Sequence, residues 1–600
     1  MNKVCLTIIR RQIDMSTEYA ANPFQLPLKN RALATMLESV LGLKPLADHY
    51  ERRPLGIAPD SFLDYTLDSL GVDVRIESDN YLAEIPRTGP VLVVANHPLG
   101  GLEGVAIAQM LLKVRPDLKV MTNQILTRIP ELRDIFIGVD VLSENAVQQN
   151  LRGVREAMKH LRDDGMLLVF PAGQVSAINV KSKRIEDRPW DRLVGQLVKR
   201  SKAVCVPIYV KGKNSRLFYL AGLLHPRLRT LMLARELSNK HGSQLDLKIG
   251  EPITPNEVKQ LDDEESITHY LRMSTDLLGL QTEEPKSPGT NQRNEIKRPS
   301  AELFHDIHAL EEFKLINHHE FDVFCAPYDK LGSMMEQIGI AREITFRAVG
   351  EGTGNSVDID QFDPHYLHLF VWDRKKQVVV GGYRIGHVDE IVAAKGIDGL
   401  YGSTLYRFDE KYLKRLGKSL EVGRSFVHPD YQRHPAALDL LWRGIGNYVA
   451  LNPEYHTLFG AVSISRDHSD MARALIAESM LGSFRAEPHY VEDVEPIKPF
   501  RVDGKIWTDE MLASLSKLSV LNKLVGRCDP GKTLPILIRH YLSLNGKFVC
   551  FSVNTVFNDS LDGLILVDMR KMPPRYLNRY LGKEGAKNFM AKWKSECNQS

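Results

Sequence analysis

A histidine and a carboxylate lie close together in residues 96–103, which read Asn-His-Pro-Leu-Gly-Gly-Leu-Glu. Proline lacks a backbone donor and the two glycines tolerate positive φ, so this segment can fold back on itself. Such a turn brings the Glu103 carboxylate to one imidazole nitrogen of His97. The other nitrogen can then take a proton from a substrate hydroxyl, while the carboxylate holds the tautomer. We therefore predict His97 as a general base and Glu103 as the acid that orients it.

A second candidate follows another apolar run, at residues 170–176, Phe-Pro-Ala-Gly-Gln-Val-Ser. A strand that ends in Pro-x-Gly makes a tight turn, and its backbone amides can meet an anion or a developing oxyanion. Taken alone, each segment also fits a purely structural turn. If both are functional, the residues predicted to bind substrate are Asn96, Gly100, Gly101, Phe170, Pro171, Gly173 and Ser176.

The elements that must position these residues alternate along the first half of the chain. Predicted strands of continuous apolar character cover 91–95, 118–122, 166–170 and 204–210, and predicted helices cover 104–112, 146–162 and 190–202. This alternation is typical of an α/β layer with a largely parallel sheet. His97 then follows the carboxyl end of a buried strand, which is where such sheets usually place their ligands.

The second half mixes its elements differently. Residues 367–372 and 378–384 alternate like a hairpin, 419–427 form a third strand and 436–449 a helix. We expect an α+β domain there. On the third strand, alternation predicts Glu421 and Gly423 on one face and Val422 and Arg424 on the other.

One polar, proline-punctuated stretch separates the halves. Residues 282–300 lack apolar periodicity, so little in them offsets the entropy of ordering. We predict an N-terminal domain at 1–281 with its core at about 80–255, a linker at 282–300 and a C-terminal domain at 301–600.

Composition excludes several classes of protein. Lys+Arg 78 against Asp+Glu 75 leaves a net charge of +3, too small to indicate a nucleic-acid partner. The 6 cysteines form no CxxC pair, which argues against a disulfide framework and a structural zinc site and favours a reducing compartment. No apolar run approaches the ~20 residues of a membrane span. Any contact with lipid is expected to be peripheral.

Basic and apolar residues are interleaved at 181–202 and at 216–229. Stretches of this kind can lie on an anionic leaflet, where each cation adds about 1 kcal/mol. An acidic protein partner could use the same surface, and a solvated charged face is the structural alternative.

In order and spacing, Asn96-His97, Phe170–Ser176 and Val206-Pro207 resemble the motifs of the glycerolipid acyltransferase family, NHxxxxD, FPEGTRS and a Val-Pro strand. The resemblance covers roughly residues 80–255. It implies an acyl thioester donor and a hydroxyl acceptor, with no metal, no cofactor and no covalent enzyme intermediate.

Three departures bear on the acceptor. The family's acid lies five residues after the histidine, where this chain has Leu102, and Glu103 is one residue later. Ala172 and Val175 replace a glutamate and an arginine that serve a glycerol-phosphate acceptor in the family. The pattern resembles the branch that acylates lyso-ornithine lipid, on the hydroxyl of a 3-hydroxyacyl chain.

The C-terminal half resembles N-acyltransferases of the GNAT superfamily over about residues 310–480, in particular ornithine N-acyltransferases. More distantly, Gly381–Arg384 and Glu421–Arg424 match the Gly-x-x-Arg and Glu-x-x-Arg strands of acyl-homoserine-lactone synthases. An acceptor amine must lose a proton, and Glu421 is the candidate base. Arg384 and Arg424, with Ser425 beside them, are candidates to hold an amino-acid carboxylate or a phosphopantetheine arm.

In coenzyme-A users of this superfamily a glycine lies in the pyrophosphate loop where this chain has Pro435, which favours an acyl carrier protein as donor. The two halves together resemble bifunctional ornithine-lipid synthases of bacteria. The resemblance implies ornithine and lyso-ornithine lipid as substrates and a peripheral location on the cytoplasmic face of the inner membrane.

Three alternatives stay open at this point. The C-terminal half could be a non-catalytic docking module for a carrier protein or a membrane, beside a single O-acyltransferase. The acceptor could be lysophosphatidic acid, although Ala172 and Val175 argue against it. A lipase is disfavoured because no Gly-x-Ser-x-Gly elbow lies near the motifs.

Overall fold

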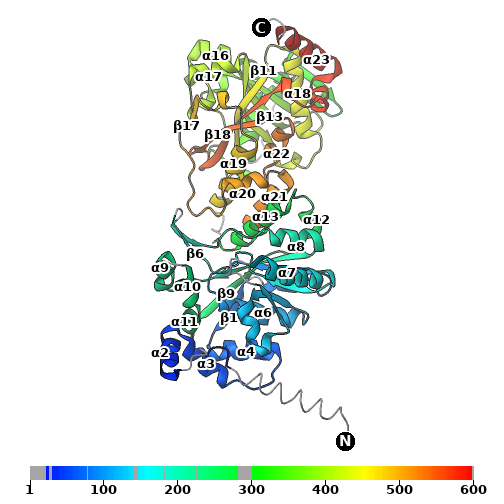
Figure 1. The fold of residues 1–600 in the computed structure, drawn as a ribbon. Helices are drawn as coiled ribbons and strands as arrows, with labels where there is room; N and C mark the ends of the chain where they lie inside the picture. Colours follow the sequence, from blue (N-terminus) through cyan, green and yellow to red (C-terminus); the bar gives the residue numbers. More distant parts are fainter. Residues whose placement is uncertain are drawn as a thin grey trace. The chain divides into compact units, whose positions relative to one another are not determined.

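The computed structural model describes residues 22–25, 30–77, 79–139, 146–180, 183–224, 226–280 and 301–597 (Figure 1). The chain divides into two compact units, one of residues 1–281 and 506–520 and the other of 282–505 and 521–600. The predicted linker, 282–300, lies outside the described residues.

A short segment from the C-terminal half belongs to the first unit. It contains α20 (Asp509–Ser514), and Ser514 Oγ lies 2.9 Å from His269 Nδ1. Nearby, Lys517 Nζ donates to the carbonyl of Gln260 at 2.9 Å. The predicted C-terminal domain, 301–600, includes residues 506–520. Their contacts are with residues about 250 positions earlier, and such distant contacts leave no local pattern in a sequence.

The first unit contains a seven-stranded sheet in which five of the six neighbouring pairs are parallel. In spatial order the strands are β1 (Asp73–Glu77), β9 (Gln244–Ile249), β8 (Val204–Lys211), β2 (Val91–Ala95), β5 (Met166–Val169), β3 (Lys119–Asn123) and β4 (Phe136–Val139). The exception is the antiparallel pair β8–β9. The predicted, largely parallel α/β sheet is therefore confirmed.

Helices cover both faces of this sheet (Figure 1). The helices of the unit are α2 (Arg31–Leu41), α3 (Leu43–Glu51), α4 (Pro59–Ser69), α5 (Asp79–Ala83), α6 (Gly101–Val114), α7 (Ala146–Arg162), α8 (Leu193–Ser201), α9 (Arg216–Leu224), α10 (Pro226–Leu231), α11 (Leu233–Ser238), α12 (Pro255–Val258) and α13 (Glu264–Leu278). A small ribbon joins β6 (Ala177–Asn179) to β7 (Arg184–Glu186).

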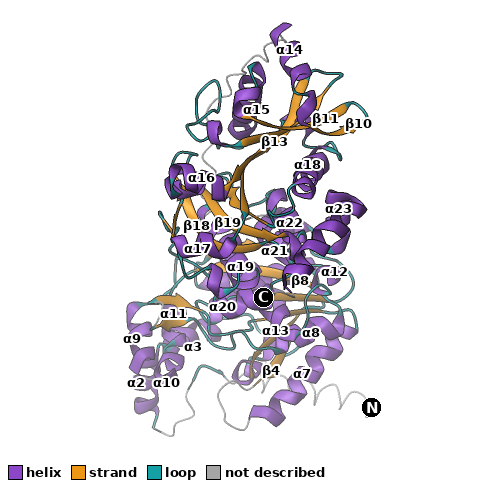
Figure 2. Ribbon diagram, turned by 90° about the horizontal axis from the view of Figure 1, so that it is seen from above, coloured by secondary structure: helices purple, strands orange, loops and turns teal. Residues whose placement is uncertain are grey.

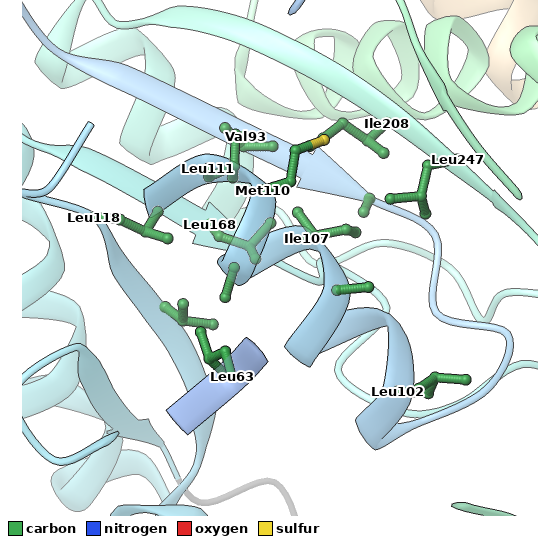
Figure 3. Close-up of a cluster of buried hydrophobic side chains, with 14 of the residues drawn as sticks. Leu63, Val93, Leu102, Ile107, Met110, Leu111, Leu118, Leu168, Ile208 and Leu247 are labelled. Atoms are coloured by element: carbon green, nitrogen blue, oxygen red, sulfur yellow. The ribbon is translucent and has the colours of Figure 1, made fainter. Parts of the chain in front are cut away.

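The core beneath α6 explains why β2 is wholly apolar. Val93 and Leu168 point from their strands toward Ile107 and Leu111 of the helix (Figure 3). All five residues of β2 are buried, because helices lie on both faces of the strand. This packing holds the end of β2, and with it His97, in a rigid frame.

The predicted elements of this unit are found with small shifts at their ends. α6 begins at Gly101 rather than Gly104, because the Glu103 carboxylate accepts from the backbone N–H of Gly100 and caps the helix. α8 begins at Leu193 rather than Trp190, because Asp191 Oδ1 accepts from the Leu193 N–H at 2.8 Å. Within the described ranges, none of the helices combines the length and apolarity that crossing a bilayer would take.

The second unit is built on an eight-stranded, mostly antiparallel sheet (Figure 2). In spatial order the strands are β10 (Lys314–His318), β11 (Phe321–Pro327), β12 (Leu367–Asp373), β13 (Val378–His387), β15 (Ser419–Val427), β16 (Thr457–Ile464), β19 (Ser560–Asp568) and β18 (Lys547–Asn554). A two-stranded ribbon pairs β14 (Tyr406–Phe408) with β17 (Val494–Pro496). The predicted hairpin, the strand 419–427 and the α+β class are confirmed.

Helices lie on both faces of this sheet as well. They are α14 (Ala301–Ala309), α15 (Ser333–Ala348), α16 (Val388–Lys395), α17 (Glu410–Leu416), α18 (Ala437–Leu451), α19 (Asp470–Ser483), α21 (Leu518–Cys528), α22 (Ile536–Ser543) and α23 (Pro574–Cys597). α15 packs on the face that carries Phe324 and Phe370, and α18 approaches Val323 and Leu369 on the other. Successive residues of a strand face opposite sides, which is why the two helices meet different members of the same strands.

The parallel strands β15 and β16 pair over only three residues each. Ser419–Glu421 align with Thr457–Phe459. Beyond that point both strands continue, but they no longer pair with each other. Next to the paired residues, Gly460 leaves no room for a side chain, since a Cβ there would lie 1.9 Å from the carbonyl oxygen of Val422. The strands therefore separate and leave a wedge in the middle of the sheet.

Candidate active sites

The loop after β2 brings His97 and Glu103 together as predicted. Nδ1 of His97 lies 3.0 Å from Oε1 of the fully buried Glu103 carboxylate. The same oxygen accepts from the backbone N–H groups of Leu99 and Gly100, each at 2.9 Å. Nδ1 is thus within ion-pair distance of the carboxylate but does not meet the angular criteria of a hydrogen bond, and Glu103 Oε2 has no hydrogen-bond partner in the described structure. Catalytic hydrogen bonds often tighten when substrate binds.

The charge of Glu103 sets the protonation of His97. Burial alone lowers the pKa of the imidazole, but the neighbouring Glu103 and the charge of Asp187 outweigh it and raise the pKa above its usual value. Because Nδ1 faces the carboxylate, Nε2 is the nitrogen left to meet a substrate, and no described residue hydrogen-bonds to it. About 18% of the His97 side chain is exposed, so a substrate can approach it.

Asp187 anchors the backbone of His97, a role that the sequence did not indicate. Its two oxygens accept from the His97 N–H at 3.2 and 3.3 Å. They also accept from Ser176 Oγ at 2.5 Å and from Trp190 Nε1 at 3.2 Å. Asp187 lies in the basic stretch 181–202, which its sequence suggested only as a binding surface. A lone aspartate 90 positions from the histidine carries no motif.

The predicted residues Asn96 and Ser176 use their polar atoms to hold the loop. The Asn96 side chain donates to the carbonyl of Val210 at 3.0 Å and accepts from its N–H at 2.6 Å. The backbone N–H of Ser176 donates to the His97 carbonyl at 2.8 Å. From the far side, Asn214 Nδ2 donates to the carbonyls of Pro98 and Leu99, both at 3.2 Å. These bonds position His97, and contact of Asn96 and Ser176 with substrate stays a prediction.

The turn at 170–176 lies against the histidine. The Phe170 ring is 4.6 Å from the imidazole, measured between centroids, and Gly173 has φ 64°, which a glycine adopts without strain. Pro171 accepts the Asp191 N–H through its carbonyl at 3.0 Å. The structure thus joins both predicted motifs, and the substrate contacts of Phe170, Pro171 and Gly173 remain predictions.

Gly100 and Gly101 shape the turn between the motifs. Gly100 has φ 108°, and a Cβ there would lie 2.9 Å from Leu233 Cδ2. Gly101 opens α6. Val175, at the place of the family's arginine, is buried with Phe218 and Tyr219 and presents no cation.

Exposed leucines gather on α9 and α10, the helices of the predicted basic-apolar stretch. The exposed residues are Leu217, Leu220, Leu223, Leu224, Leu228 and Leu231, and Leu224 is 82% exposed. We call these six residues the leucine patch. A row of this kind is more apolar than an ordinary solvated surface.

A cleft opens in the second unit where β15 and β16 separate. It is lined by Glu421, Arg424 and Ser425 from β15, by Arg384 from β13, and by Ser463 from β16. The four predicted residues of the C-terminal half, Glu421, Arg384, Arg424 and Ser425, therefore line one cavity.

Glu421 is buried and already well supplied with donors. Its oxygens accept from the Tyr366 hydroxyl, from the Tyr401 N–H at 3.2 Å and from the Gly402 N–H at 2.6 Å. Burial raises the pKa of this carboxyl above its usual value, and the donors oppose that rise. A raised pKa suits proton acceptance, while the donors fix where the carboxylate lies.

The two arginines of the cleft are held by aspartates that the sequence did not single out. Arg384 Nη1 donates to Asp360 at 2.6 Å and to Asp363 at 3.3 Å, and Arg424 Nη2 donates to Asp360 at 2.7 Å. Arg384 is 1% exposed and its guanidinium lies over the Tyr366 and Tyr401 rings, yet its Nε and Nη2 have no hydrogen-bond partner among the described residues. Buried donors of this kind are costly unless a ligand meets them.

Side chains do not alternate strictly along β15. The prediction that Glu421 and Arg424 face opposite sides of the sheet therefore does not keep them out of one cleft. Arg384 pairs with Gly423 and Gly382 with Phe426, so two residues, Arg424 and Ser425, oppose one on β13. Arg424 also has φ 48°. The bulge re-aims the arginine, and Glu421 and Arg424 line the same cleft.

Comparison with known families places a domain in each half. Residues 49–280 match the family model described as "Acyltransferase", and residues 341–443 match the "Acetyltransferase (GNAT) domain". The chain thus joins an acyltransferase domain and a GNAT domain in one polypeptide. It is an acyltransferase enzyme.

Three relatives are informative. The glycine N(alpha)-acyltransferase of Phocaeicola vulgatus is 29% identical over 45% of this chain and 86% of its own length. The lyso-glycine lipid O-acyltransferase of the same organism is 28% identical over 32% of this chain and 68% of its own length. The L-ornithine N(alpha)-acyltransferase of Rhodobacter capsulatus is 38% identical over 18% of this chain and 42% of its own length. One chain thus resembles both an O-acyltransferase and N-acyltransferases, which supports a bifunctional acyltransferase over a non-catalytic C-terminal module.

Proposed function

Since this chain joins an acyltransferase domain to a GNAT domain, we propose that it makes ornithine lipid in two steps. The C-terminal domain attaches a 3-hydroxyacyl chain to the α-amine of ornithine. The N-terminal domain then esterifies the hydroxyl of that chain with a second acyl group. The observation that carries this proposal is the presence of two separate sites, one with a histidine–glutamate pair and one with a buried glutamate, each suited to one of the two deprotonations.

In the O-acylation step, His97 Nε2 takes the proton of the lyso-lipid hydroxyl as its oxygen attacks the thioester carbonyl. The C–O bond forms, the C–S bond breaks, and the imidazolium returns the proton to the leaving thiolate. Glu103 stabilises the transient charge on the ring, from 3.0 Å away. Val175, which cannot neutralise a phosphate, favours an acceptor without a glycerol phosphate.

In the N-acylation step, the amine of ornithine attacks the thioester carbonyl of the donor. The C–N bond forms, the C–S bond breaks, and Glu421 accepts the proton of the amine and returns it to the leaving thiolate. The free Nη2 and Nε of Arg384 are placed to meet the carboxylate of the amino acid.

We propose acyl carrier protein as the thioester donor for both domains. Pro435, which lies before α18 where coenzyme-A users carry a glycine, supports this choice. The cations of the 183–202 stretch give an acidic carrier a complementary surface in the first unit.

The leucine patch supports peripheral attachment to a membrane. Leucines on α9 and α10 can enter the apolar boundary of a leaflet, while Arg216 and the nearby cations meet anionic head groups. Such attachment would keep the amphipathic intermediate near the second site, and fusion of the domains raises its effective concentration. The proposed location is the cytoplasmic face of the inner membrane.

The test is a reconstitution with the purified full chain, ornithine, 3-hydroxyacyl carrier protein and acyl carrier protein. Mass spectrometry is expected to detect a monoacylated amide first and a diacylated lipid later. If neither product forms with either the carrier protein or the coenzyme-A thioester, the proposal is wrong. Formation with the coenzyme-A thioester alone would overturn the donor and leave the two reactions in place.

A further inference from the structure

The cleft of the second unit carries opposite charges on different walls. Arg384 and Arg424 line it from β13 and β15, and Glu351 and Asp562 line it from other elements. Glu351 follows α15 in the chain, and Asp562 belongs to β19. The arginines explain how an amino-acid carboxylate can be held, but nothing in the two proposed reactions uses the two acids.

Glu351 and Asp562 are brought together by the pairing of β16 with β19. Ser463 is the direct cross-strand neighbour of Asp562, and side chains of such a pair project to the same face. Ser463 Oγ donates to Glu351 Oε2 at 2.9 Å, which ties the glutamate to this pair. Both carboxylates are buried, with 5% and 4% of each residue exposed.

Neither acid forms an ion pair in the described part of the chain, although the charge of Arg424 acts on Asp562 from a greater distance. No Lys, Arg or His among the described residues lies within 4.0 Å of a carboxylate oxygen of Glu351 or Asp562. Asp562 accepts only from neutral groups, Asn554 Nδ2 at 2.8 Å and Ser560 Oγ at 2.9 Å. Two buried carboxylates that line one cavity with no ion pair of their own destabilise the fold unless one of them is protonated or a ligand supplies the charge.

The protonation of the two groups agrees with this geometry. Burial raises the pKa of Glu351 to about 8, and the charge of Asp562 adds to the rise. Burial likewise raises the pKa of Asp562. Without substrate the site therefore holds a proton at neutral pH, and an incoming cation displaces it.

We propose that Glu351 and Asp562 bind the side-chain ammonium of the acceptor amino acid and so select a dibasic substrate. This inference rests on the proposed N-acylation and adds the residues that read the head group. Arg384 holds the carboxylate while Glu351, with Asp562 beside it, receives the terminal ammonium. An amino acid with its carboxylate at one end and a side-chain ammonium at the other pairs with both the arginines and the acids of the cleft, whereas glycine leaves the acids unpaired.

The test compares ornithine with norvaline, which has the same carbon chain without the terminal ammonium. With the full chain and 3-hydroxyacyl carrier protein, we expect kcat/KM for ornithine to exceed that for norvaline by on the order of 10–100-fold, as for a charge-assisted bond. Equal turnover of the two amino acids would overturn the inference while leaving the N-acyltransferase assignment intact. Failure to acylate any amino acid would instead remove the proposed function itself.

Glu351→Gln tests whether Glu351 is responsible for the preference for ornithine over norvaline. It is expected to lower kcat/KM for ornithine on the order of 10-fold or more and to leave norvaline within about twofold, so that selectivity is lost. Glu312→Gln, at an exposed position of the same unit, is the matched control and should change neither substrate. Equal loss of both substrates from Glu351→Gln would identify Glu351 as a base or a structural residue and contradict the inference.

Discussion

The site around His97 is built from one loop and the turn beside it, whereas the cleft around Glu421 is assembled from elements between Phe346 and Asp562. His97 and Glu103 are six positions apart and meet because two glycines allow the chain to turn. Arg384, Arg424 and their aspartates meet only through the register of several strands. A local site leaves a motif in the sequence, and a dispersed one leaves single charged residues.

The two sites also treat charge differently. In the first unit a single buried carboxylate, Glu103, faces a partly exposed imidazole. In the second unit, Arg384 and Arg424 share Asp360, Arg384 also contacts Asp363, and the cleft holds two further acids that form no ion pair among the described residues. The first arrangement suits proton transfer to a hydroxyl at a surface, and the second suits recognition of a small, highly charged molecule away from water.

The largest predicted effect is the loss of one of the two activities, O-acylation, through a single substitution at His97. His97→Ala removes the base and is expected to lower O-acylation of added lyso-lipid on the order of 10²–10⁴-fold, with N-acylation unchanged. Each half-reaction is measured separately by mass spectrometry. His241→Ala, an exposed histidine in the same unit, is the control. Loss of both activities from His97→Ala would break the comparison, because the sites would then not be independent.

Glu421→Gln is expected to lower N-acylation on the order of 10²-fold or more and to spare O-acylation. The amide keeps the shape but cannot accept the proton, and it also sets an NH₂ group against donors that now serve the carboxylate. Circular dichroism checks the fold, and Glu410→Gln on exposed α17 is the control. An unchanged rate of amide formation would remove Glu421 from the chemistry.

Asp187→Asn tests how the position and the electrostatic surroundings of His97 contribute, because it leaves the imidazole itself unchanged. We expect O-acylation to fall on the order of 10-fold, as hydrogen bonds to a charged group are lost. The charge of Asp187 helps raise the pKa of His97, so its removal lowers that pKa. The base acts when neutral, and the rising limb of the pH–rate profile should therefore move to lower pH. A loss of rate with an unmoved limb would contradict the electrostatic part.

Leu224→Glu tests whether the two units differ in their attachment to lipid. A charge on the most exposed leucine of the patch should weaken binding to anionic vesicles several-fold, since an apolar contact is replaced by repulsion. Activity on detergent-solubilised lyso-lipid should stay the same. Leu451→Glu, at an exposed position of the second unit, is the control in a flotation assay. Equal binding by both variants would remove the leucine patch from the account.

The smallest predicted effect concerns stability. The pKa of Glu351 is raised to about 8, so the folded unit holds a proton that the unfolded chain releases above the usual glutamate pKa. Stability is therefore lost as pH rises from about 4.5 to 8, and Glu351→Gln should raise Tm at pH 8 more than at pH 5. Asp562 and Asp467 face the same carboxylate and stay in place. An equal shift of Tm at both pH values would contradict the burial of an uncompensated acid.

Features built from neighbouring residues could be predicted from the sequence, and features assembled from distant residues could not. The strands 91–95 and 204–210 and the pairing of His97 with Glu103 were predictable, because apolar runs and glycine turns are local. Asp187 was not, since it acts through a backbone N–H 90 positions away. The bulge at Arg424 was equally hidden, because it arises from a register shift between two strands. Nothing in the sequence indicated that Glu351 and Asp562 bind a substrate. They come together because Ser463 of β16 pairs with Asp562 of β19 and hydrogen-bonds to Glu351.

The central claim, that one chain carries two independent acyl-transfer sites, is tested most directly by mixing two variants. His97→Ala keeps the C-terminal site and Glu421→Gln keeps the N-terminal site, so neither alone converts ornithine to diacylated lipid. We predict that the mixture restores the diacylated product, with the monoacylated amide passing between molecules. A mixture that makes no diacylated lipid, although each variant retains its own half-reaction on supplied substrate, would contradict the account.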